Sequence, residues 1–129
     1  MVLSANGSPY VDPQNQTLES KLVAKLNGNN HDLIDIALNS RGELFASTAG
    51  SGCIWKIGKP DPNNVYESKK KMPWVDLRNL TLNPKAKCSD IAFDNRDRLY
   101  ICSGNKDTNL AHNGTIYRAT DLGDFGKLA

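Results

Sequence analysis

The feature that most constrains this chain is a sequence segment that occurs twice. Residues 35–47 read DIALNSRGELFAS and residues 90–102 read DIAFDNRDRLYIC, and they align without a gap at an offset of 90 − 35 = 55 positions. A second pair follows, because residues 52–57 (GCIWKI) match residues 114–119 (GTIYRA). A repeat of this length is typical of propellers and repeat arrays, in which each copy is one structural unit.

Each copy has the pattern of β-strands joined by tight turns. Residues 33–38 form a short and largely apolar run, which predicts a strand covered on both faces. Turn-forming residues follow at 39–42 and at 94–97, where Asn, Asp and Gly tolerate left-handed backbone. Further strands are predicted at 43–48, 53–57 and 72–77, and one more at 22–26, before the first copy.

This strand pattern predicts an all-β fold with two four-stranded antiparallel sheets. Residues 1–16, rich in Ser, Asn and Pro, are expected to form an N-terminal arm or linker. The first unit then spans residues 17–77, with its preceding edge strand, and the second spans residues 78–129. The fourth strand of the second unit is expected to be incomplete, because the chain ends where that strand begins.

Residues 35–46 and 90–101 resemble the blades of NHL-type and gluconolactonase-type (calcium-regulated, lactonase-like) β-propellers. The resemblance rests on the phrases DIALNSRGELFA and DIAFDNRDRLYI and implies four-stranded blades that pack face to face around a channel. Two departures matter. Asp35 and Asp90 replace the usual Gly of the motif, and Ile34 and Ser89 stand where lactonase-like propellers carry a metal-binding Asn.

Two blades leave two apolar faces open, and exposed faces of that kind are unstable in water unless they are interfaces. The expected partners are therefore other blades, contributed by further copies of the chain or by missing chain. Three copies would give six blades, and four would give eight. A structural subunit of a large assembly, with the faces packed against a different protein, is another interpretation.

Blade topology also predicts where a ligand would bind. The segments at 27–32, 49–52, 78–88 and 104–113 are expected to share one rim, and long loops on a rigid scaffold often carry recognition. The candidate ligand-binding residues are His31, Asp32, Asp35, Asp90, Lys106, Asp107, His112 and Asn113. No spacing indicates a nucleophile, a nucleotide loop or a zinc site, so no catalytic or metal-ligating residue is assigned.

Asp35 and Asp90 have two interpretations. They could line the channel and bind a cation or polar ligand, or each carboxylate could accept backbone N–H groups from a neighbouring loop and pin the blades together. Their recurrence at one repeat position favours the structural role. For Trp55 and Trp74, packing within the blades is favoured over stacking on sugars.

Charge and targeting signals exclude several classes of partner. A net charge of +2, from 16 basic and 14 acidic side chains, gives no reason to expect nucleic acid or an anionic membrane. The N-terminus has no signal-peptide pattern, which predicts a cytoplasmic or other intracellular protein with reduced cysteines.

These observations favour a non-enzymatic binding or scaffolding module that presents rim loops to a protein or glycan. The alternatives are a lactonase-like or other hydrolytic propeller with a metal-dependent site completed by further blades, and the structural subunit described above. No cofactor is expected, although calcium would accompany the lactonase-like alternative.

Overall fold

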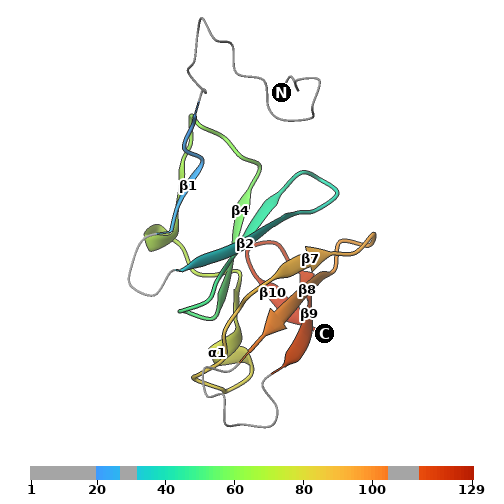
Figure 1. The fold of residues 1–129 in the computed structure, drawn as a ribbon. Helices are drawn as coiled ribbons and strands as arrows, with labels where there is room; N and C mark the ends of the chain where they lie inside the picture. The colour runs from blue at the N-terminus through green and yellow to red at the C-terminus, as the bar shows by residue number, and fades with distance from the viewer. Residues whose placement is uncertain (1–19, 27–31, 105–113) are drawn as a thin grey trace, which may run out of the picture.

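A computed structural model describes residues 20–26, 32–104 and 114–129 of the chain. Two four-stranded antiparallel sheets make up most of this structure (Figure 1). The first sheet has the strand order β2-β3-β4-β6, and the second has the order β10-β9-β8-β7. The expected all-β fold with two antiparallel sheets of four strands is therefore confirmed.

Within each four-stranded sheet, neighbouring strands come in chain order. The first sheet consists of β2 (Leu33–Leu38), β3 (Leu44–Thr48), β4 (Cys53–Gly58) and β6 (Val75–Asp76), and a short helix, α1 (Leu77–Leu80), follows it. The second sheet consists of β7 (Ile91–Phe93), β8 (Leu99–Ser103), β9 (Thr115–Asp121) and β10 (Gly126–Leu128). A separate parallel pair joins β1 (Ala24–Lys25) to β5 (Tyr66–Glu67), next to a 3₁₀ helix, η1 (Ser68–Lys70).

The two matching sequence segments form hairpins with the same turn. In the first hairpin the Asn39 side-chain oxygen accepts the N–H groups of residues 41 and 43 at 3.0 and 2.9 Å. In the second, Asp94 accepts those of residues 96 and 98, both at 2.9 Å. Each turn then needs one residue with positive φ, which is Gly42 at 76° and Asp97 at 57°. Asp97 replaces Gly because Asp tolerates this conformation better than most residues.

Two segments differ from the sequence-based expectation. Gly126–Leu128 pairs with β9 along its whole length, so the second sheet has four strands like the first. The strand expected at 22–26 lies outside both four-stranded sheets and pairs in parallel with β5. The long connection between β4 and β6 makes this possible, because it brings Tyr66 beside Val23, whose carbonyl accepts the Tyr66 N–H at 3.0 Å.

The two sheets pack face to face around one apolar core. Phe45, Ile54 and Val75 of the first sheet belong to the same buried cluster as Leu99 and Ile101 of the second. The Phe45 ring meets Trp74 and Phe93 edge to face, with both pairs of ring centres 4.9 Å apart. The packing expected for Trp74 and Trp55 is confirmed, since they are 2% and 4% exposed.

Hydrogen bonds also join the two sheets. The buried Ser47 hydroxyl donates to the Ser89 carbonyl at 2.6 Å. At the turns, the N–H of Ser40 donates to Asp97 at 2.8 Å, and the Ser40 hydroxyl donates to the other oxygen of that carboxylate. These contacts fix how the first hairpin lies on the second.

The face of β2 that points away from the second sheet is exposed, although the sequence predicts that it is covered. Ile34, Ile36 and Leu38 are 47%, 56% and 59% exposed, so the expectation of a strand covered on both faces is wrong for 33–38. The reason is that the second sheet packs against the opposite face, while the β1–β5 pair reaches only the β4 side, at Trp55 and Cys53. Within the described residues, no helix has the length and apolar character of a membrane span.

Candidate functional site at the loop rim

Arg78 holds two loops together at one end of the first sheet. Its guanidinium donates to the carbonyl of Ala86 at 3.3 Å and to the carbonyl of Gly50. Nearby, the Leu77 N–H donates to the Gly52 carbonyl at 2.9 Å. The loop between β3 and β4 and the segment from α1 to β7 therefore form one connected surface, which we call the loop rim.

Asp32 and Gly104, which belong to the other two expected rim segments, form backbone hydrogen bonds at the same end of the molecule. The Asp32 carbonyl accepts the N–H of Ala49 at 2.9 Å, and the Gly104 carbonyl accepts that of Lys87 at 3.2 Å. Figure 1 shows this end at the lower left of the molecule, and the β2–β3 and β7–β8 turns on the opposite side. The four expected rim segments therefore have described residues at one end of the sheets.

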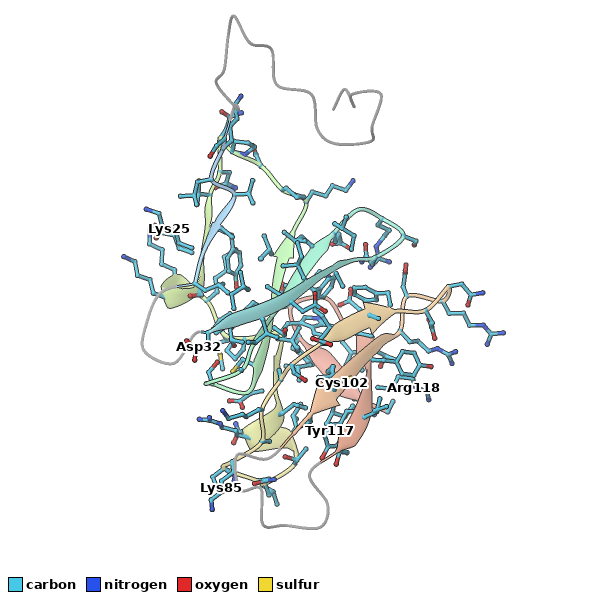
Figure 2. All side chains as sticks on the ribbon, viewed as in Figure 1. Lys25, Asp32, Lys85, Cys102, Tyr117 and Arg118 are labelled. Atoms are coloured by element: carbon cyan, nitrogen blue, oxygen red, sulfur yellow. The ribbon has the colours of Figure 1, made fainter. Side chains whose placement is uncertain are left out.

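Asp32, Asp35 and Asp90 are the expected site residues that lie within the described part of the chain. His31, Lys106, Asp107, His112 and Asn113 lie outside the described residues. Asp32 is exposed at the start of β2 (Figure 2). Asp35 lies in β2 and Asp90 directly precedes β7, and these two edge strands contact each other. The Asp35 carboxylate accepts the N–H of Ile91, the residue that follows Asp90, so these two repeat positions lie near each other across the sheet interface.

Asp35 has the structural role favoured by its position in the repeat. One carboxylate oxygen accepts the N–H of Ile91, across the sheet interface, at 2.9 Å, and the other accepts the N–H of Ile36 at 2.9 Å. Asp90 holds the same position in the second sheet but is exposed, and its carboxylate has no hydrogen bond within the described residues.

Replacing Asp35 by alanine is expected to lower the free energy of unfolding by about 1–3 kcal/mol, because the N–H of the buried Ile91 loses its acceptor. Asp90→Ala is the matched control, measured in dilute solution, and should change the free energy of unfolding by less than about 0.5 kcal/mol. Urea titration of both variants measures the difference. Equal effects would contradict the assigned role of Asp35.

The cysteines and acidic groups are dispersed. Burial raises the pKa of Cys53 to about 11 and raises that of Cys88 further, so both thiols stay protonated at neutral pH. Cys102 is exposed on β8 (Figure 2), and all three cysteines are free thiols, as expected. In the described part of the chain, no group of three or more His, Cys, Asp or Glu side chains is placed to hold a metal ion.

Leu82 is a rim residue that the sequence analysis did not identify. Its φ of 55° lies in the left-handed region, where a bulky residue is a genuine outlier, and its side chain is 87% exposed. Leu80, the last residue of α1 and two positions before Leu82, is 52% exposed. No local sequence pattern predicts the left-handed conformation or the exposure of Leu82, because the nearby Asn79 and Asn83 look like ordinary turn residues.

Asp121 ties the outer strands together at the opposite end of the sheets. It accepts hydrogen bonds from Lys56 Nζ at 2.8 Å, from Trp74 Nε1 at 3.2 Å and from the Gly123 N–H at 2.8 Å. Burial alone would raise the pKa of Asp121, but these hydrogen bonds outweigh it, and the pKa lies below its ordinary value of 3.8. A cavity of about 720 Å³ lies beside this cluster, lined in part by Lys56, Trp74 and Met72.

The lowered pKa of Asp121 predicts a loss of stability in acid. A carboxyl group with a depressed pKa in the folded state stabilises the fold above its unfolded-state pKa, and that stabilisation is lost as pH falls through the folded-state pKa. The free energy of unfolding should therefore decrease below about pH 4. Asp121→Asn should cost about 0.5–1 kcal/mol at pH 7 and flatten this decrease. An unchanged pH dependence of urea unfolding in the variant would count against it.

No family model, curated protein or solved structure matches the chain. The class that the structure itself defines is an all-β protein of two packed four-stranded sheets with a loop rim at one end.

Proposed function

We propose that this chain is a propeller-type, non-enzymatic module that binds a partner protein through the loop rim. The propeller interpretation is supported by the resemblance of the repeated segment to propeller blades and by the face-to-face packing of two sheets with the same strand order. The first strands of the two sheets, β2 and β7, also lie in contact, as neighbouring inner strands would around a channel.

The observation that carries the binding function is the conformation of Leu82. A left-handed leucine costs free energy, and strain of this kind is concentrated at functional sites. Here it is accompanied by almost complete exposure of a large apolar side chain, next to the half-exposed Leu80. Arg78 fixes the base of the segment through the Gly50 and Ala86 carbonyls, which gives a contact surface that is ordered before binding.

A protein fits this surface better than a glycan does. Burial of a large apolar side chain against an apolar partner surface is favourable, which suits the exposed Leu82 and Leu80. Sugar-binding sites use exposed aromatic rings, whereas Trp55 and Trp74 are both buried. The expected partner therefore has an apolar pocket that accepts a leucine side chain.

Photo-crosslinking tests this proposal. A photo-reactive amino acid at position 82 should form a covalent product with one defined protein in an extract of the producing cell, and the same group at Met72 should not. Met72 is a matched control because it is 86% exposed and lies beside the cavity at the other end of the sheets. Leu82→Asp, which suits a positive φ, should abolish capture of that protein by the immobilised chain.

Equal crosslinking from positions 82 and 72, or retention of the partner by Leu82→Asp, would contradict the proposal. Binding of defined oligosaccharides on a glycan array, unaffected by Leu82→Asp, would identify a glycan-binding module instead.

A further inference from the structure

The interface between the two sheets provides a template for a second interface. The first sheet contributes the face that carries Ile54, and the second contributes the face that carries Ile91, both of which belong to the buried core. Each sheet also has a second face, which points away from this interface. We call the side of the first sheet that carries Ile36 the leading face, and the side of the second sheet that carries Ile116 the trailing face.

The leading and trailing faces carry the same kinds of side chain as the buried interface, at matching repeat positions. Ile36 corresponds to Ile91, yet Ile36 is 56% exposed and Ile91 only 6%. Ile116 corresponds to Ile54, yet Ile116 is 70% exposed and Ile54 is fully buried. What distinguishes the members of each pair is whether a neighbouring sheet covers them.

The polar groups match in the same way. Within the chain, the Asp35 carboxylate accepts the Ile91 N–H across the interface. On the trailing face, Asp90 holds the position of Asp35, and its carboxylate has no hydrogen bond within the described residues. On the leading face, Ile36 holds the position of Ile91, and its N–H donates to the carboxylate of the adjacent Asp35 at 2.9 Å. The two faces thus offer an acceptor and a donor in corresponding places.

The leading face is open along β2, where Ile34, Ile36 and Leu38 are exposed. The β1–β5 pair covers the side of the first sheet near Trp55 but leaves the β2 side open. A groove of about 450 Å³ remains between them, lined in part by Leu22, Ile36 and Ala46.

On the second sheet, the trailing face includes the side chains of Cys102 on β8 and of Arg118 and Ile116 on β9; Figure 2 labels Cys102 and Arg118.

We infer that the trailing face of one copy of the chain binds the leading face of a second copy. In this contact the Asp90 carboxylate accepts the Ile36 N–H of the next copy, as Asp35 accepts that of Ile91 within the chain. The inference rests on the propeller interpretation in the proposed function. Because two different faces meet, the contact is head to tail and repeats until a ring closes. Closed propellers have about four to eight blades, which corresponds to about two to four copies.

The contact between copies should be weaker than the one within the chain. The hydrogen bonds from Ser40 to Asp97 have no counterpart there, because Gly42 occupies the position of Asp97 in the first sheet. Cys102, a weak donor, occupies the position of the buried Ser47 hydroxyl. Assembly should therefore depend on concentration.

Sedimentation and native mass spectrometry of the full chain, over roughly 1–100 μM, test the inference. The unmodified chain should form a particle of two to four copies. Ile36→Asp and Ile116→Asp should each give the mass of a single folded chain, because each variant loses one face. Both side chains are already exposed within the chain, so the single-chain fold should survive. Met72→Asp, at a more exposed site beside the cavity next to Asp121, should keep the mass of the unmodified particle.

Mixing the two variants provides the decisive measurement. Ile36→Asp keeps an intact trailing face and Ile116→Asp keeps an intact leading face, so an equimolar mixture should form one-to-one pairs. Asp90→Ala should raise the concentration for half-assembly about tenfold, by loss of one hydrogen bond to a charged acceptor. A single-chain mass for the unmodified protein, an unfolded chain, or a mixture that does not pair would overturn the inference.

Assembly through the leading and trailing faces does not involve the loop rim. Leu82→Asp should leave the particle mass unchanged, so that loss of partner capture and loss of assembly identify failure of different proposals.

Discussion

Phe45→Ala is expected to lower the free energy of unfolding by about 3–5 kcal/mol. Phe45 is completely buried and lies between the two sheets, where its ring contacts both Trp74 and Phe93. Removing the ring leaves a cavity bordered by both sheets, so neither sheet can close it without moving the other. Urea or thermal unfolding, followed by near-UV circular dichroism of the tryptophans, measures the effect.

Phe125→Ala is the matched control for this prediction. Phe125 has the same side chain but is 57% exposed in the β9–β10 turn, so its loss should cost less than about 1 kcal/mol. A double-mutant cycle between Phe45 and Phe93 should show a coupling of about 0.5–1.5 kcal/mol, the range for edge-to-face ring pairs. Similar losses in Phe45→Ala and Phe125→Ala would mean that the two sheets are not joined by this core.

Local features of the fold could be predicted because they depend on adjacent residues. The turns after β2 and β7 each begin with Asn or Asp, whose side chain accepts nearby N–H groups, and each includes a residue that tolerates positive φ. Recurrence of one pattern at an offset of 55 positions then indicates that the same hairpin forms twice. The same recurrence predicted a structural carboxylate in each unit, which the structure shows for Asp35 but not for Asp90 within the described residues.

Features that depend on contacts between distant residues were not predictable in this way. The pairing of β1 with β5 joins residues 66 − 24 = 42 positions apart, and neither segment has a pattern that specifies its partner. The role of Arg78 depends on carbonyl groups of Gly50 and Ala86, which any residue supplies. The left-handed conformation of Leu82 opposes its own local preference, and so it can only follow from the surrounding structure.

Gly52 is the second position where a small change should have a large effect. Its φ is 68°, and a Cβ atom added there would lie 2.5 Å from the Ala86 carbonyl oxygen and 3.2 Å from a side-chain carbon of Arg78. The closest atom belongs to the backbone, so the overlap is relieved only if the rim loops separate. Gly52→Ala should therefore lower the free energy of unfolding by about 3–5 kcal/mol, from about 1–2 for the left-handed conformation and the rest from overpacking.

Gly42→Ala separates these two causes. Gly42 also has a positive φ, 76°, but no atom lies within 4 Å of the position that its Cβ would take. Its replacement should cost only the conformational share, about 1–2 kcal/mol. Because the Gly52 carbonyl also accepts the Leu77 N–H at the start of α1, Gly52→Ala should increase proteolysis within 78–88, whereas Gly42→Ala should not. Equal destabilisation in the two variants, or an unchanged cleavage pattern in Gly52→Ala, would show that the approach of Ala86 to Gly52 does not hold the rim together.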